Sequence, residues 1–241
     1  MVADEVRCLG ENARTLLSAV DLNQLREIDG RRMSPAEHLA AEKTALIIVD
    51  MTNSFCDPEW HAHGDEEKKQ WAASELEIAI PNIQQVLAIF RQTRAMVVHV
   101  VTAKWTTDAR EAVPYARGRD YGLFDSDPMS VIEQLAPIPG EVIIRKVTSS
   151  SFTGTGLDYL LKNAGIENVV ITGQYGDACC FYTLIQSREF GFSNYWVQDC
   201  LFYSMPLYRE LHAHLVPIRW AKLATHQQIV AALASGRTER R

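Results

Sequence analysis

The chain has 241 residues, a length that suits one large domain, and 47% of them are hydrophobic, which is enough for a real core. Its net charge of −6 argues against a dedicated surface for nucleic acid or anionic membrane, because both are usually bound through clustered Lys and Arg. No apolar run approaches the roughly 20 residues that cross a bilayer. We therefore expect a small-molecule substrate and neither a nucleic-acid nor a membrane partner.

Five cysteines are spread along the chain, at Cys8, Cys56, Cys179, Cys180 and Cys200. Their number is odd and no two of them form a CxxC pair, so they indicate reduced thiols rather than a disulfide framework. The amino terminus also lacks the basic start and apolar stretch of a secretory signal. These features predict a cytoplasmic protein.

The first 40 residues are polar and of mixed charge, with one amphipathic piece around Leu16–Leu25. They predict a helical amino-terminal arm, and the alternative is a frayed tail. Residues 41–236 form the predicted main domain, and residues 237–241 a disordered carboxyl-terminal tail.

Within the main domain, short apolar runs alternate with segments of helical periodicity. We expect strands at residues 45–50, 96–102, 141–146, 168–173, 194–199 and 218–224. We expect helices at residues 75–93, around 131–135, at 156–165, from about 179, at 207–215 and at 226–235. Pro81 is expected in the first turn of the first of these helices.

Unbroken apolar runs such as those at 45–50 and 168–173 are typical of strands buried on both faces. Their alternation with helices predicts an α/β fold, a Rossmann-like three-layer α/β/α sandwich with a six-stranded, mainly parallel sheet. Ligands of such sheets bind beyond the carboxyl ends of the strands. The residues at these ends are Asp50, Thr102–Lys104, Lys146, Gly173–Cys179 and Asp199.

Asp50 and Lys146 end the first and third predicted strands. An acid held there by rigid backbone suits a general acid or base, although it could instead cap the next helix. A lysine at the neighbouring position can keep that acid ionised and stabilise negative charge on a substrate. The alternative for Lys146 is a surface lysine that extends its ammonium into water.

Cys179 lies near the start of a predicted helix, after the turn that follows the fourth strand. The positive end of the helix dipole is expected to lower the pKa of such a thiol, and free backbone N–H groups there can hold an oxyanion. The alternatives are that Cys179 and Cys180 are both buried structural residues, or that they form a strained vicinal disulfide.

The histidines do not form a convincing metal site. His61 and His63 are two residues apart, but no third ligand is evident nearby, and His99 lies inside an apolar strand. No glycine-rich phosphate loop follows the first strand. We therefore expect neither a metal nor a cofactor.

Three segments together resemble the isochorismatase-like hydrolase superfamily: ALIIVDMTNSF at 45–55, VIIRKVTSSSF at 142–152 and VVITGQYGDACCF at 169–181. The later segment YWVQDCLFYSMP at 195–206 fits the last strand and loop of that family, and the resemblance covers about residues 40–235. It implies a catalytic triad of Asp50, Lys146 and Cys179. It also implies a cis peptide bond between Gln174 and Tyr175, which turns a backbone N–H into the oxyanion hole.

Features of two branches of the family are combined in this chain. Tyr175 is similar to the isochorismatases proper, whereas Cys179 and Asp177 match the amidase branch. The stretch after the second strand, residues 102–110, has no histidine, which excludes the metal site of the nicotinamidases.

The leading hypothesis is therefore a metal-free cysteine hydrolase that cleaves a C–N bond of a small amide, carbamoyl or ureido compound through a thioester. A second hypothesis is vinyl-ether cleavage with Asp50 as general acid and no covalent intermediate. A third is a non-catalytic binding protein of the same fold. Residues expected to form the oxyanion hole or to bind substrate are Gln174, Tyr175, Phe55, Lys104 and Arg110.

Aromatic residues in or near the loops after the first two strands are candidates for the roof of the pocket, or else for a subunit interface. They are Trp60, Trp71, Trp105, Tyr115, Tyr121 and Phe124. Since oligomers are common in the family, the resemblance also implies a homodimer or homotetramer, which the amino-terminal arm could help to form.

Overall fold

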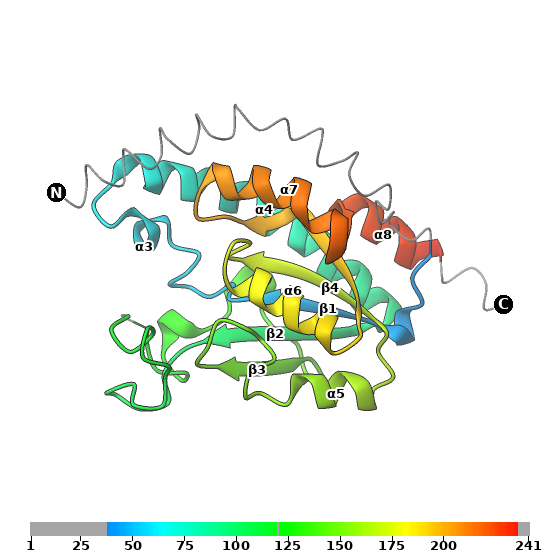
Figure 1. The fold of residues 1–241 in the computed structure, drawn as a ribbon, viewed down its shortest axis with the longest axis horizontal. Coiled ribbons are helices and arrows are strands. Elements are labelled where there is room, and N and C mark those ends of the chain that lie inside the picture. The colour runs from blue at the N-terminus through cyan, green and yellow to red at the C-terminus, as the bar shows by residue number, and fades with distance from the viewer. Residues whose placement is uncertain (1–37, 120, 236–241) are drawn as a thin grey trace.

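The computed structural model describes residues 38–119 and 121–235 of the chain (Figure 1). The predicted amino-terminal arm, apart from residues 38–40, and the predicted tail at 237–241 lie outside these residues. No helix in the described ranges is both long enough and apolar enough to cross a membrane.

A six-stranded sheet forms the centre of the molecule, with strand order β3-β2-β1-β4-β5-β6 and every neighbouring pair parallel (Figure 1). The predicted α/β class and parallel six-stranded sheet are confirmed. The strands are β1 (Thr44–Val49), β2 (Met96–Thr102), β3 (Val142–Lys146), β4 (Asn168–Gln174), β5 (Ser193–Phe202) and β6 (Lys222–Ala224). The side chains of β1 are all buried, as its unbroken apolar run predicts.

Helices cover both faces of the sheet. The α-helices are α3 (Pro58–Ala62), α4 (Glu66–Thr93), α5 (Leu157–Asn163), α6 (Cys179–Glu189), α7 (Pro206–Arg219) and α8 (His226–Ser235). Short 3-10 helices are η1 (Ala41–Lys43), η2 (Asp127–Met129) and η3 (Glu133–Leu135).

Successive side chains of each strand enter two different cores, since they point to opposite faces of the sheet. Leu46 and Ile48 of β1 pack into the core that α4 and α8 cover. Ala45 and Ile47, together with Val49, pack into the core that α5, α6 and α7 cover. This arrangement gives the expected three layers.

The helix predicted at 75–93 begins earlier than expected, at Glu66, and Pro81 lies in its interior rather than in its first turn. Its start is set by Asp65, whose carboxylate accepts hydrogen bonds from the backbone N–H groups of Glu67 and Lys68. The helix predicted around 131–135 is only the 3-10 turn η3. At the other end of the chain, α7 continues through Pro217 to Arg219, and β6 is correspondingly shorter than predicted.

Gly173 brings the carboxyl ends of β1 and β4 close together. Its φ is +106°, and a Cβ at this position would lie 2.2 Å from the carbonyl oxygen of Val49. Only glycine fits such an approach. The residues that follow β1 and β4 are therefore presented side by side at one edge of the sheet.

Candidate active site

Asp50 directly follows β1 and is 1% exposed, with a backbone φ of 56°. Its backbone N–H donates to the carbonyl of Val100 at 2.8 Å, which continues the pairing of β1 with β2. The Oδ1 atom accepts hydrogen bonds from the backbone N–H and the hydroxyl of Thr102, both at 2.8 Å. The carboxylate is thus fixed by the end of the neighbouring strand.

Lys146 ends β3, and its side chain is fully buried. Its Nζ atom lies 2.8 Å from Asp50 Oδ2 and donates to the carbonyl of Thr148 at 3.1 Å and to the hydroxyl of Thr102. Burial opposes the charged form of this amine, but the carboxylate of Asp50 and the contact with Cys179 raise the Lys146 pKa above its ordinary value. Lys146 is therefore a permanent ammonium.

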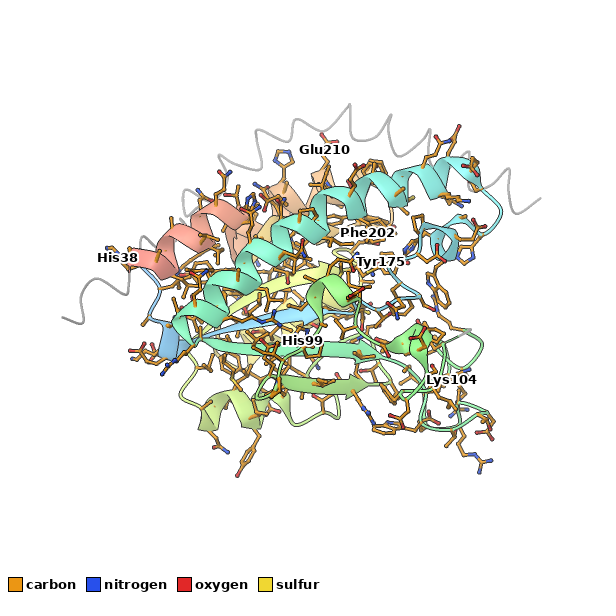
Figure 2. The ribbon with its side chains drawn as sticks, turned by 180° about the vertical axis from the view of Figure 1, so that it is seen from behind. His38, His99, Lys104, Tyr175, Phe202 and Glu210 are labelled. Atoms are coloured by element: carbon orange, nitrogen blue, oxygen red, sulfur yellow. The ribbon has the colours of Figure 1, made fainter. Side chains whose placement is uncertain are left out.

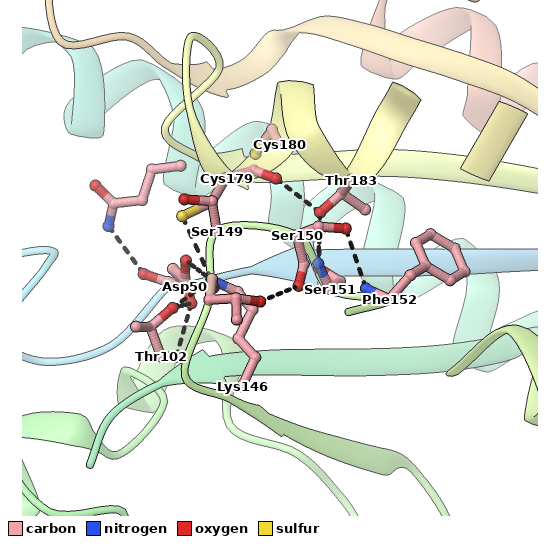
Figure 3. A network of polar contacts seen from close by, with 12 residues as sticks. Asp50, Thr102, Lys146, Ser149, Ser150, Ser151, Phe152, Cys179, Cys180 and Thr183 are labelled. Carbon is pink, nitrogen blue, oxygen red and sulfur yellow. Dashed lines mark hydrogen bonds and ion pairs between the residues drawn. The ribbon is translucent and has the colours of Figure 1, made fainter. Parts of the chain in front are cut away.

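Cys179 is the first residue of α6, and its Sγ atom lies 3.3 Å from Lys146 Nζ (Figure 3). The structure thus brings Asp50, Lys146 and Cys179 into one cluster at the carboxyl edge of the sheet, from three separate strands and turns. The side chain of the preceding residue, Ala178, makes no capping hydrogen bond to α6. The amino-terminal N–H groups of this helix are therefore not capped by that residue.

The expectation of a lowered thiol pKa is wrong. Burial raises the pKa of Cys179 to about 12, and the positive charge of Lys146 only partly offsets that effect. The physical reason is charge balance, because the Asp50 carboxylate already neutralises the Lys146 ammonium. Ionising the thiol would add a second, uncompensated negative charge beside the buried Asp50 carboxylate. The resting sulfur is a neutral thiol.

Gln174, the last residue of β4, is fully buried. Its Nε2 atom donates to the carbonyl of Asp50 at 3.0 Å and to the carbonyl of Phe55 at 2.8 Å. Because both partners are acceptors, this end of the side chain must be the amide nitrogen. Gln174 therefore ties the backbone after β1 to the end of β4, and the role of its side chain is structural.

The peptide bond between Gln174 and Tyr175 is cis, at the position that the family resemblance implies. The turn that follows is held by contacts with Tyr203 and Ser204, which come directly after β5. A Cβ on Gly176 would lie 2.6 Å from the ring of Tyr203, and the carboxylate of Asp177 accepts hydrogen bonds from the backbone N–H and the hydroxyl of Ser204. These contacts position the start of α6.

Tyr175 contacts His61, which lies on α3 and is 9% exposed. The Nε2 atom of His61 bonds to the carbonyl of Phe55 at 2.8 Å, so Nε2 carries the proton and Nδ1 accepts the hydrogen bond from the Tyr175 hydroxyl. Burial lowers the pKa of His61. Figure 2 shows Tyr175 beside Phe202, and their ring centroids are 5.2 Å apart.

A cavity of about 530 Å³ opens beside the cluster, and Cys179 and Asp50 form part of its wall. Of the predicted binding residues, Phe55, Gln174 and Tyr175 line it. Of the aromatic candidates, Trp60, Tyr115 and Tyr121 line it. The other lining residues are His63, Thr102, Gly118, Arg119, Ser149 and Ala178.

The predictions that Lys104 and Arg110 bind substrate are not supported, because neither lines this cavity. Lys104 pairs through its backbone with Gly122 and Phe124 in the loop after β2 and lies well away from Tyr175 (Figure 2). Arg110 is 77% exposed and forms an ion pair with Asp108 at 2.6 Å. Because Asp108 is only two residues away in the sequence, this ion pair keeps the guanidinium of Arg110 at the surface.

Four other candidates also lie outside this cavity. Asp199 is inside β5, and its carboxylate binds the ring and backbone of His226 at the start of α8. Trp71 donates its indole N–H to the carbonyl of Tyr203. Trp105 and Phe124 pack on each other, with ring centroids 4.4 Å apart.

Arg119 is the functional candidate that the sequence reasoning missed. It lines the cavity, but it belongs to a loop that also contains Arg110 and Arg117. Nothing in the sequence distinguishes the three arginines, because the choice depends on how the loop folds over the sheet.

The remaining cysteines near the site have structural environments. Cys180 is fully buried in the core, with its Sγ atom 3.8 Å from the carbonyl of Thr172, and it is a free thiol. This packing supports the structural interpretation for Cys180 and excludes a vicinal disulfide with Cys179. Burial also raises the pKa of Cys56, to about 12.

Within residues 38–119 and 121–235, no group of three or more His, Cys, Asp and Glu side chains is arranged to hold a metal ion. His99, inside β2, is 1% exposed and bonds to Glu141 at 3.0 Å. Glu141 in turn binds Arg91.

Fold and site together define an α/β protein with a carboxylate, an ammonium and a thiol at the carboxyl edge of a parallel sheet. The isochorismatase domain model matches residues 44–227, more than half of the chain. The chain belongs to the isochorismatase family and is a hydrolase of that family.

An uncharacterized isochorismatase family protein, YrdC, from Bacillus subtilis (strain 168) is 31% identical over 66% of this chain and 73% of its own length. A cysteine hydrolase from Pseudomonas syringae pv. phaseolicola 1448A has a similar fold, with a TM-score of 0.72, 19% identity and coverage of 85% of this chain and 98% of that one. The N-carbamoylsarcosine amidase of Thermoplasma acidophilum has a TM-score of 0.61 and 26% identity, over 76% of this chain and 96% of that one.

Proposed function

We propose that the protein is a cysteine-dependent hydrolase that cleaves a C–N bond of a small amide, carbamoyl or ureido compound. The observation that carries the proposal is the position of the Cys179 sulfur, 3.3 Å from the Lys146 ammonium and in the wall of the cavity, beside the buried carboxylate of Asp50. A nucleophile, a base and a cation are thus within reach of one bound molecule. Similarity to an N-carbamoylsarcosine amidase supports the choice of a C–N bond.

In the first step, the Cys179 sulfur attacks the carbonyl carbon while Asp50 takes the thiol proton. Since the resting thiol is neutral, proton transfer and attack must be coupled, and a base in direct reach is required. Lys146 lies 2.8 Å from the Asp50 carboxylate and orients it before the transfer. It also offsets the negative charge that develops on the sulfur.

The tetrahedral oxyanion is held by the backbone N–H groups of Tyr175 and of Cys179, the first residue of α6. When the intermediate collapses, the C–N bond breaks and the leaving nitrogen takes the proton from Asp50. A thioester on Cys179 remains. Asp50 then removes a proton from a water molecule, which attacks the thioester. When the C–S bond breaks, the acid is released and the Cys179 sulfur takes the proton back from Asp50, which restores the resting thiol and carboxylate.

The test is to replace the sulfur. We expect Cys179→Ala and Cys179→Ser to lose turnover, measured as ammonia release from a panel of small amides and ureido acids, while circular dichroism and thermal unfolding stay close to wild type. When the wild-type reaction is quenched during turnover and the protein is analysed by peptide mass spectrometry, we expect an acyl adduct on the peptide that contains Cys179. The matched control is Cys180→Ala, because that sulfur lies in the core and does not line the cavity.

Two other results would overturn the proposal. Turnover that survives in Cys179→Ala but disappears in Asp50→Asn would indicate chemistry without a covalent intermediate, such as vinyl-ether cleavage. If neither variant changes the rate of turnover of any tested compound, the site is not catalytic.

We further propose that the protein functions in the cytoplasm, because a mechanism with a free thiol at Cys179 fits a reducing compartment. Assembly into a homodimer or homotetramer stays a prediction, which analytical ultracentrifugation would test.

A further inference from the structure

Part of the cavity wall is aromatic. Phe55 packs edge-on against Trp60 and Tyr121, with centroid distances of 5.2 and 5.6 Å. The rings of Trp60 and Tyr121 are stacked at 6.3 Å with an interplanar angle of 18°. These residues come from α3 and from the loops after β1 and β2, and together they offer a broad apolar surface to a bound molecule.

Arg119 contributes a positive charge to the same cavity. Burial raises the pKa of both Tyr121 and Tyr175, and the charge of Arg119 acts in the opposite direction on each of them. The guanidinium therefore acts electrostatically on two residues that line the cavity with it.

The other two arginines of this loop have partners, whereas Arg119 has none in the part of the chain that the structure describes. Arg110 binds the carboxylate of Asp108, and Arg117 donates to the carbonyls of Ala112 and Arg110. Among the described residues that line the cavity, Asp50 is the single carboxylate, and it already binds Lys146. None of these described residues therefore supplies a counter-charge to the guanidinium of Arg119.

An unpaired guanidinium beside an aromatic wall has a definite chemical complement. Guanidinium groups bind carboxylates through two parallel hydrogen bonds, and flat apolar groups bury their surface against aromatic rings. The volume of about 530 Å³ lies within the usual range for small-molecule sites and exceeds what a bare carbamoyl group needs.

We propose that the substrates are amides or ureido compounds that carry a carboxylate, bound by Arg119, and an aromatic or other flat apolar group, packed on Phe55, Trp60 and Tyr121. This inference rests on the proposed function and specifies its substrate class. The scissile carbonyl then faces Cys179, and the acid part of the molecule points to the loop after β2.

Binding separates this inference from catalysis. In the full-length Cys179→Ala protein, which is expected to bind without turnover, calorimetry would measure the affinity of three probes. N-carbamoylphenylalanine has both recognition groups, phenethylurea lacks the carboxylate, and N-carbamoylglycine lacks the ring. We expect the first probe to bind about ten- to a hundredfold more tightly than either of the others.

Arg119→Gln tests the charge. In the same background, we expect it to weaken binding of N-carbamoylphenylalanine by about tenfold or more and to leave phenethylurea within about twofold. Arg110→Gln is the matched control, since it removes the same charge from the same loop at a position outside the cavity. Circular dichroism shows that each variant is folded.

Three results would overturn the inference: equal affinity for the carboxylate and its uncharged analogue, equal affinity for the ring-containing and ringless acids, or equal losses in Arg119→Gln and Arg110→Gln. If the carboxylate probe binds as expected but the wild-type protein releases no ammonia from it or from related amides, the proposed function alone is contradicted.

Discussion

The Lys146 ammonium lies 2.8 Å from the Asp50 carboxylate, and the two side chains are 0% and 2% exposed. Each charge is tolerable in this place only because the other is present. Lys146→Met should therefore leave an uncompensated carboxylate in the core and lower the free energy of unfolding by about 3–5 kcal/mol. Urea denaturation followed by tryptophan fluorescence measures this loss.

The double variant Asp50→Asn/Lys146→Met distinguishes charge from shape. It removes both charges, so we expect it to regain most of the stability that Lys146→Met loses, while turnover stays absent in both proteins. If the single variant were as stable as the wild type, the carboxylate would have to be solvated or protonated in the fold, and the pair would not hold the site together.

The raised pKa of Cys179 predicts a reactivity profile. Because burial keeps the thiol neutral to about pH 12, the rate of alkylation by iodoacetamide should increase with pH, without a plateau, from pH 7 to pH 10. The increase approaches about tenfold per pH unit, in proportion to the thiolate fraction. The rate is measured by mass spectrometry of intact protein, and the rate in Cys179→Ala is subtracted to remove the other cysteines. A plateau below pH 8 would mean that the resting sulfur is ionised.

Thr102 is expected to be a positioning residue for the acid. Its hydroxyl donates to Asp50 Oδ1 and accepts from Lys146, so it orients both charges at once. Thr102→Val keeps the shape but loses these bonds, and a hydrogen bond to a charged group contributes about 1.5–3 kcal/mol. We expect kcat/KM to fall by about ten- to a hundredfold.

Thr102→Ser is the matched control, because it restores the hydroxyl without the methyl group. It should recover most of the activity that Thr102→Val loses, with both variants equally well folded. A serine variant that loses activity while the valine variant keeps it would show that packing of the methyl group matters and that the hydroxyl does not.

The parts of the structure that depend on local pattern could be predicted from the sequence. The apolar runs of β1 and β4 end at residues that the sheet necessarily brings to one edge, which is why Asp50 and Cys179 could be proposed as neighbours. The start of α4 is harder to predict from the sequence, because the first turns of this helix are polar and only the cap by Asp65 sets the boundary.

Other features depend on three-dimensional packing and cannot be predicted from the local sequence pattern. The contact between Thr102 and Asp50 follows from the register that places Val49 beside Val100. The pKa of Cys179 follows from the competition between burial and a lysine charge that Asp50 already neutralises. A helix dipole favours the ionised form of a thiol, but burial opposes that form more strongly at Cys179.

His61 links the site to the pH dependence of stability. Burial lowers its pKa in the folded protein, whereas the unfolded chain has the ordinary value of about 6.5. Below pH 6.5 the unfolded state therefore binds more protons than the folded state, so the contribution of His61 to stability is present above that pH and is lost as the pH falls. The loss proceeds at up to about 1.4 kcal/mol per pH unit, until the pH reaches the pKa of the folded protein.

His61→Gln removes the imidazole that takes up a proton. The side-chain amide of the glutamine can still donate to the carbonyl of Phe55, the partner of His61 Nε2. Between pH 6.5 and pH 5, the unfolding free energy of this variant should fall less steeply than that of the wild type, by up to about 1.4 kcal/mol per pH unit. The matched control is His63→Gln, which removes an exposed imidazole two residues away and should keep the wild-type slope. Urea denaturation across this pH range measures all three proteins. Equal slopes for His61→Gln and the wild type would mean that the imidazole at position 61 is protonated to the same extent in the folded and unfolded chain, which its burial between Tyr175 and Phe55 does not allow.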